Sequence, residues 1–301
     1  MAVIRKMYRT RNSCIMARTM PFPAWSCLFL LQLGCGQQPS GVSSDRPPLV
    51  ATSLDQGSKA VEKGDFDMAI SCFSETIRQK PDSAEAYYAR GDAYGMNGKY
   101  DEANRDFDEA IRLKPDYAQA HHARGKASAM QSSFAVAVAA CTEAIRLKPD
   151  YAAAYLTRAK ANDMRGVLTD VIADCTEAIR LKPDFVEAYK TRGSVYRHKN
   201  EFDKAIADFT ETVRLKPDDA LAYVARGTAY EKKGDLDKAI ADVTEAIRLK
   251  PDLSTAYNIR SGYYQSKGDT ASSRKDLQRA KELDNAARFE KTVPLLRYQD
   301  F

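Results

Sequence analysis

The heptapeptide AIRLKPD at residues 110–116 contains the signal that decides the fold. Proline ends a helix because its ring disfavours the helical conformation of the residue before it, and the Asp that follows can cap the next helix. The Lys-Pro-Asp unit recurs every 34 residues, without an insertion, at Pro81, Pro115, Pro149, Pro183, Pro217 and Pro251. A fixed period of this length indicates a repeat array. The sequence therefore predicts stacked helical units.

Each unit also carries a packing face. An Arg-Gly pair recurs, with an aromatic residue three positions before the Arg and, in most copies, another four after it. The two aromatic residues and the Gly share one helical face, and the Gly leaves room for a second helix. A residue suited to a left-handed turn then separates the two halves of each unit. These residues are Gly64, Gly98, Gly166, Gly234 and Gly268, with Ser132 and Asn200 in the other two units.

This pattern resembles the tetratricopeptide repeat. The resemblance implies an all-α fold, a right-handed superhelical solenoid of antiparallel helix-turn-helix repeats with about seven copies over residues 53–287. The first and last copies are degenerate, as capping units often are. Small or polar residues replace packing residues in the central copies, at Ser128 and Ala159 among others. We expect the array to be softest across residues 125–175.

A second periodic feature places an Asp sixteen residues after the Arg of most units, whereas Arg124 faces Ala140. The resembled family usually keeps Leu at this Arg position. Because the Arg adjoins the packing Gly, we expect the pairs to lie between helices and to fix their register, not to bind a ligand. The pairs are Arg90–Asp106, Arg158–Asp174, Arg192–Asp208, Arg226–Asp242 and Arg260–Asp276.

The residues typical of catalysis and metal binding do not form a motif. The three His lack the spacing of a zinc site, and His121 occupies a core aromatic position. None of the six Cys forms a CxxC pair, so Cys72, Cys141 and Cys175 are interpreted as buried free thiols. The chain also lacks a Gly-rich phosphate loop and a nucleophilic Ser motif. We expect no enzyme activity, no metal and no cofactor.

The face of each first helix that points away from the packing face should line the concave side of the superhelix. In the resembled family, that side binds extended peptides or partner helices. Its residues vary between units, which is typical of a surface that recognises a specific partner, although unselected drift is the alternative. The excess of basic groups indicates an acidic segment with apolar anchors at Tyr88 and Leu156. The expected groove residues are Tyr88, His122, Lys126, Leu156, Lys160, Lys190 and Arg197.

The positive charge is concentrated at the N-terminus. Residues 1–49 contain six basic residues and one acid, and removing these from totals of 46 and 41 leaves 40 residues of each sign in residues 50–301. A nucleic-acid binder needs a basic stripe to neutralise phosphates. The neutral body therefore argues against nucleic acid as a partner.

Residues 1–35 have the order of an export signal: a basic stretch, an apolar run at residues 25–31 and small residues before Cys35. This resembles a bacterial lipoprotein signal, in which Cys35 becomes the lipidated first residue, although Gln32 departs from the pattern. Residues 36–52 would form a flexible linker and residues 288–301 a C-terminal tail. An organellar leader, an uncleaved anchor and spurious upstream sequence remain as alternatives.

These patterns predict an exported scaffold that holds another protein in its concave groove. It would be tethered to the bacterial cell envelope through its N-terminus alone. The alternatives are a soluble cytoplasmic adaptor and an accessory subunit that presents a substrate to a separate enzyme.

Overall fold

The computed structural model describes the backbone of residues 49–296 and the side chains of residues 53–286. The described helices belong to one compact unit, residues 47–301. The predicted leader with Cys35, and most of the predicted linker, lie outside the described residues.

The described backbone is entirely helices and short turns. Its helices are α1 (Leu49–Glu62), α2 (Phe66–Gln79), α3 (Ala84–Met96), α4 (Tyr100–Leu113), α5 (Ala118–Met130), α6 (Phe134–Leu147), α7 (Ala152–Met164), α8 (Leu168–Leu181), α9 (Val186–His198), α10 (Phe202–Leu215), α11 (Ala220–Lys232), α12 (Leu236–Leu249), α13 (Ser254–Ser266) and α14 (Thr270–Leu296).

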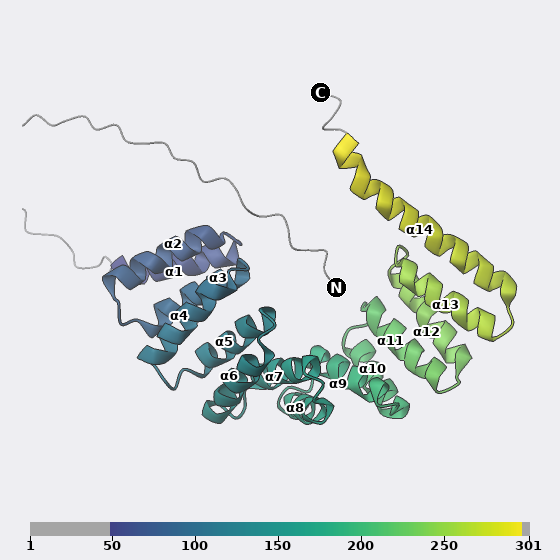
Figure 1. Ribbon diagram of the computed structural model, residues 1–301, viewed down its shortest axis with the longest axis horizontal. Coiled ribbons are helices and arrows are strands. Elements are labelled where there is room, and N and C mark those ends of the chain that lie inside the picture. Colours follow the sequence, from purple (N-terminus) through teal and green to yellow (C-terminus); the bar gives the residue numbers. More distant parts are fainter. Residues whose placement is uncertain (1–48, 297–301) are drawn as a thin grey trace, which may run out of the picture. The chain divides into compact units, whose positions relative to one another are not determined.

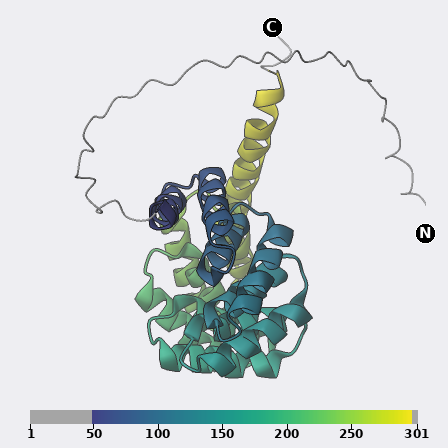
Figure 2. The same ribbon diagram turned by 90° about the vertical axis from the view of Figure 1, so that its left-hand side faces the viewer.

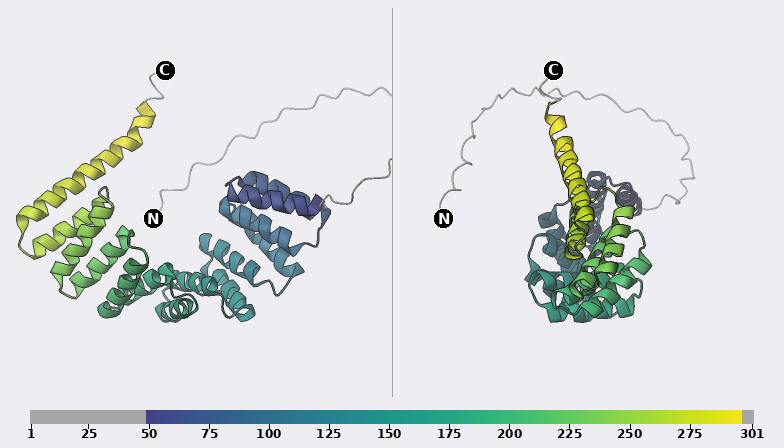
Figure 3. Two further views of the ribbon diagram at one scale, coloured as in Figure 1. Left: turned by 180° about the vertical axis from the view of Figure 1, so that it is seen from behind. Right: turned by 90° about the vertical axis from the view of Figure 1, so that its right-hand side faces the viewer.

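Each odd-numbered helix packs against the even-numbered helix that follows it, and each even-numbered helix packs against the next odd-numbered helix (Figure 1). The odd-numbered helices from α1 to α11 also contact one another in order, whereas consecutive even-numbered helices make no comparable contacts within the described part of the chain. The odd-numbered helices therefore line the inner side of the array, and the even-numbered helices lie outside (Figures 2 and 3). The predicted all-α solenoid is confirmed.

Glycines at the packing face set how closely the two helices of a hairpin approach. A Cβ added to Gly91 would lie 2.8 Å from the Phe107 ring, and one added to Gly125 would lie 2.6 Å from the Cys141 sulfur. Gly57 lies equally close to Phe73, so the degenerate first unit keeps the same contact. These contacts explain why a small residue recurs at this position.

The core position on the even-numbered helices is filled unequally. Fully buried Phe73, Phe107 and Phe209 fill this position in α2, α4 and α10, whereas the smaller Cys141, Cys175 and Val243 fill it in α6, α8 and α12. Burial raises the pKa of the Cys141 and Cys175 thiols to about 12, so both are unreactive.

The expectation that Cys72 is a buried thiol was wrong. Cys72 is half-buried, because its neighbour Phe73 occupies the core position of α2. A one-residue shift along a helix moves a side chain about 100° around the axis, away from the core.

The turns between paired helices use the left-handed conformation as expected. The five glycines at these turns have φ between 74° and 88°. Ser132 and Asn200 adopt φ of 60° at the equivalent positions, although side chains disfavour this region.

The ends of the array differ from the predicted limits at residues 53 and 287. Helix α1 begins at Leu49, and α14 continues to Leu296, so part of the predicted C-terminal tail is helical. The reason for the longer last helix is local: Asn285 stands where the other units carry a helix-ending proline.

Candidate functional site

The Arg and Asp residues sixteen positions apart form bidentate ion pairs. In the first pair, Arg90 Nε donates to Asp106 Oδ2 at 2.7 Å and Arg90 Nη2 donates to Asp106 Oδ1 at 2.8 Å. The carboxylate is buried, and its hydrogen bond raises the pKa of the Arg90 guanidinium. The same geometry recurs at Arg158, Arg192, Arg226 and Arg260.

A third contact links each of these pairs to the preceding hairpin, and sequence reasoning missed it. Arg192 Nη1 donates to Thr176 Oγ1 on α8 at 2.9 Å, sixteen residues before the Arg. A hydroxyl residue with the same 34-residue period was the available signal. The other acceptors are Ser74, Thr142, Thr210 and Thr244. Each Arg thus spans two hairpins.

Arg124 reverses this arrangement. Its Nε lies 2.7 Å from Asp108 on the preceding hairpin, at the position where other units carry Ser or Thr. The Asp108 side chain is 57% exposed, against 8% for that of Asp106. The ion pair is therefore retained on the other side of the Arg, where water screens it more.

The aromatic and apolar groove residues lie deeper than the sequence pattern indicates. The Tyr88 ring lies 5.1 Å from the Tyr117 ring and 6.0 Å from the Phe107 ring, and burial raises the Tyr88 pKa to about 12. Leu156 is only 7% exposed and belongs to the core between α7 and α9. Leu156 therefore packs beneath the inner surface, and little of its side chain is accessible to a partner.

His122 connects three segments of the inner side. Its Nε2 lies 2.9 Å from Thr157 Oγ1 on α7, and its Nδ1 lies 3.0 Å from the Tyr151 hydroxyl. Since the Thr157 hydroxyl donates to the Ala153 carbonyl, Nε2 is the donor and Nδ1 accepts from Tyr151. Burial, assisted by Lys126, lowers the His122 pKa to about 4, so the ring is neutral at pH 7.

The four predicted basic groove residues are not equivalent. Lys190 is held by Asp219 at 2.9 Å and by Glu187 at 3.5 Å. Arg197 has a buried Nε without a hydrogen-bond partner among the described residues. Lys160 lies 3.7 Å from Glu187, and Lys126 has no ion pair within the described side chains.

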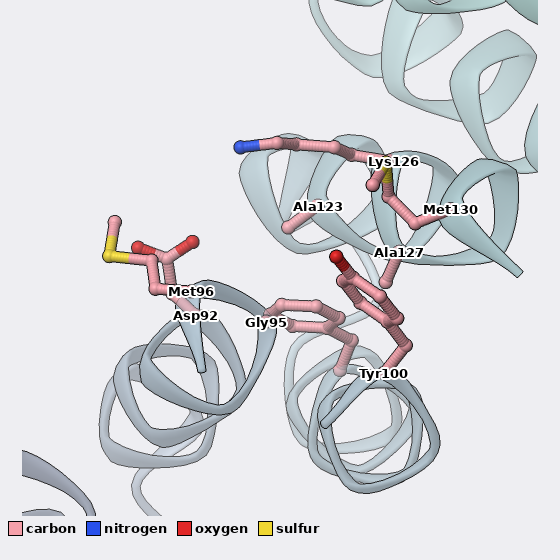
Figure 4. A pocket seen from close by; sticks show the side chains of 9 residues that line it. Asp92, Gly95, Met96, Tyr100, Ala123, Lys126, Ala127 and Met130 are labelled. Atoms are coloured by element: carbon pink, nitrogen blue, oxygen red, sulfur yellow. The ribbon is translucent and has the colours of Figure 1, made fainter. Parts of the chain in front are cut away.

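Two pockets open between consecutive odd-numbered helices, and the structure brings Lys126 and Lys160 together there. Pocket A lies between α3 and α5 and is lined by Asp92, Gly95, Met96, Tyr100, Phe107, Ala123, Lys126, Ala127 and Met130 (Figure 4). Pocket B lies between α5 and α7 and is lined by Lys126, Ala129, Met130, Ser132, Phe134, Thr157, Lys160, Ala161 and Met164. Sequence reasoning missed the methionines, although they recur with the 34-residue period.

Neither a metal site nor a membrane-spanning helix occurs within the described residues. No group of three or more His, Cys, Asp or Glu side chains there is arranged to hold a metal ion. No helix between residues 49 and 296 combines the length and the apolar character needed to cross a membrane.

Models of the tetratricopeptide repeat match residues 89–152, 152–220, 190–254 and 224–288, and a further TPR repeat model matches residues 57–98. The chain belongs to the tetratricopeptide repeat family. Members of this family are generally non-enzymatic scaffolds for protein interaction, and this chain has their fold. No curated protein matches the chain.

Solved structures with this fold share little sequence with the chain. The C-terminal part of a TPR repeat-containing protein from Cytophaga hutchinsonii has a TM-score of 0.63 at 18% identity, and the match covers 77% of this chain and 95% of that one. PilW, described as a type IV pilus biogenesis factor, has a TM-score of 0.62 at 16% identity, with 68% and 96% covered. YrrB, described as a TPR protein with an unusual peptide-binding site, has a TM-score of 0.53 at 19% identity, with 61% and 95% covered. At such identities the likeness concerns the fold alone.

Proposed function

We propose that the chain is a binding scaffold that holds a segment of another protein against the inner side of its array. The observation that carries this proposal is the pair of pockets between α3, α5 and α7. The five Arg–Asp pairs at Arg90, Arg158, Arg192, Arg226 and Arg260, which we call the Arg–Asp ladder, are engaged in contacts between helices. The pockets, in contrast, open on side chains that no helix covers.

The inner side also favours an acidic partner. Lys126 and Lys160 project at the pockets, and their charges are weakly compensated by neighbouring carboxylates. Opposite charge on a partner would speed its association and orient it, while apolar contacts would supply most of the affinity.

Copurification from the native cell extract tests the proposal. A variant with Lys126→Glu and Lys160→Glu should lose the partner, or bind it more slowly and with a flatter salt dependence, at unchanged helical content. A variant with Lys204→Glu and Lys238→Glu has the same charge change on α10 and α12 and should retain the partner. Equal retention by both variants would place the binding site elsewhere.

We further propose that the chain is exported and tethered through a lipid on Cys35. The motivation is the order of residues 1–35 and the composition of residues 36–48, before α1, which is rich in Gly, Ser, Pro and Gln. Mass spectrometry of the mature N-terminus should find an acylated Cys35, and Cys35→Ser should release the chain from the membrane fraction. A mature protein that retains residues 1–34 would instead favour the cytoplasmic adaptor.

A further inference from the structure

Three methionines form a periodic exposed feature on the inner side. Met96, Met130 and Met164 are the last residues of α3, α5 and α7, and they are 49%, 59% and 66% exposed. Single exposed apolar residues are ordinary on protein surfaces, but three at one position of successive repeats form a row. The equivalent residues of the other units are polar: Glu62, His198, Lys232 and Ser266.

The methionines border the two pockets. Pocket A lies between Met96 and Met130, and pocket B lies between Met130 and Met164, so that Met130 lines both. Alanines and aromatic side chains form most of the remaining lining. We call this surface, from Met96 through both pockets to Met164, the methionine track. Unbranched methionine side chains adapt their shape to an incoming apolar group.

The charge along the track sets the character of its occupant. Lys126 lines both pockets and Lys160 lines pocket B, whereas Asp92 is the one carboxylate in either lining. In Figure 4, the Lys126 ammonium group lies at the edge of pocket A, beyond the apolar side chains. The lining is thus net positive, which complements an acidic segment.

The repeat geometry sets the spacing. The helices α3, α5 and α7 belong to successive hairpins, which stack about 10 Å apart, so equivalent points of the two pockets are separated by about that distance. Along an α-helix, seven residues rise about 10.5 Å and return to the same face. Along an extended strand, same-face side chains repeat at about 6.6 Å, which does not match this spacing.

We propose that the methionine track binds an amphipathic helix of another protein, with two apolar side chains seven residues apart and acidic residues beside them. The first apolar side chain occupies pocket A and the second occupies pocket B, while the acidic residues pair with Lys126 and Lys160. This inference rests on the proposed scaffold function and assigns the class of partner segment to it.

Fluorescence anisotropy with labelled synthetic helical peptides tests the assignment on the full chain. The probe carries two leucines seven residues apart with flanking glutamates; one control peptide has the leucines five residues apart, and another replaces the glutamates by lysines. The probe should bind at least about tenfold more tightly than either control peptide.

Variants locate the binding. Met130→Ser and Lys126→Glu should each weaken probe binding by about tenfold or more. The matched controls are Met68→Ser, at a methionine 53% exposed on α2, and Lys204→Glu on α10; both should bind as the unaltered chain does. Circular dichroism verifies that every variant keeps its helical content.

Equal binding of the three peptides, or probe binding unchanged by Met130→Ser, overturns the inference. Copurification of the native partner distinguishes this failure from a failure of the proposed scaffold function. If the partner still copurifies with Met130→Ser and contacts the inner side elsewhere, the methionine track is wrong and the scaffold function stands. If the partner contacts only the outer helices, both proposals fall.

Discussion

Individual residues show how a polar group is retained between helices. Each ladder Arg satisfies a buried carboxylate on its own hairpin and a hydroxyl on the hairpin before it. Removing one partner of such a pair leaves the other charge buried, without hydration and without an ion pair. A buried pair therefore adds little stability over an apolar pair of similar volume, but the loss of one partner destabilises the array strongly.

Arg192→Ala tests this role. The Arg192 side chain is 16% exposed and that of Asp208 is 7% exposed, so truncation of Arg192 leaves a buried carboxylate unpaired. We expect a loss of about 3 kcal/mol in the free energy of unfolding, measured by urea denaturation. Lys204→Ala, at an exposed ion pair, should lose less than about 1 kcal/mol.

A second variant isolates the cause. Arg192→Ala combined with Asp208→Ala removes the stranded charge, and the double variant should regain part of the loss. Equal midpoints for Arg192→Ala and Lys204→Ala would show that water reaches the pair.

His122 gives the array a pH dependence. Its pKa is about 4 in the folded chain, against an ordinary value near 6.5, because burial disfavours the charged ring. The folded state therefore binds fewer protons between these values, and stability present above pH 6.5 is lost as the pH falls toward 4. The loss amounts to about 3 kcal/mol at pH 4.

Denaturation curves at pH 7 and pH 4.5 compare the unaltered chain with His122→Asn. The variant should lose less stability on acidification, because Asn does not titrate. A pH dependence that is the same in both proteins would show that His122 is solvated.

Ser132 stores local strain. It adopts φ of 60° in a turn where five other units use Gly. A side chain in the left-handed region costs about 1–2 kcal/mol, of which the greater freedom of Gly in the unfolded chain cancels a part. Ser132→Gly should raise stability by about 0.5–1 kcal/mol, seen as a higher thermal midpoint. The reverse change, Gly98→Ser, should lower it.

The helices and turns could be predicted from the sequence, because proline, glycine and the spacing of apolar residues determine the structure within a single repeat. The Arg–Asp pairs also follow, since both residues lie in one hairpin. The hydroxyl partners and the Arg124–Asp108 pair were missed because they join different hairpins. Cys72 was misplaced because it lies one residue, about 100° around the helix axis, from the core position of α2. Leu156 was misplaced because its burial depends on contacts with α8 and α9. The methionine track could not be predicted, because its two pockets are formed by residues of several consecutive helices.

The central hairpins combine several weakening features. Cys141 and Cys175 replace phenylalanine in α6 and α8, the Arg124 ion pair is exposed, and Ser132 is strained. Local opening should therefore cost less free energy there than in α9–α12, where Phe209 fills the core position of α10 and Val243 that of α12.

Hydrogen exchange with mass spectrometry measures this difference. Amides in the middle of α5–α8 should exchange faster than those in the middle of α9–α12, consistent with the expected soft segment at residues 125–175. Uniform protection across these helices would show that the smaller core residues are compensated by closer packing.

At the scale of the whole array, stability and binding use opposite sides of the same helices. The odd-numbered helices direct their periodic residues toward the even-numbered helices and their variable residues toward the inner side. A scaffold of this design can change its partner without changing its fold, because the ladder and the packing glycines do not contact the pockets' open side.

The most direct test of the central claim is site-specific photocrosslinking in the native cell. A photoreactive phenylalanine analogue replaces Lys126 or Lys160 on the inner side, and Lys204 or Lys238 on the outer helices, all at exposed positions. The account predicts that one partner protein is captured from the two inner positions and is absent from the two outer ones. Capture of that partner from Lys204 and Lys238, with none from Lys126 and Lys160, would contradict it.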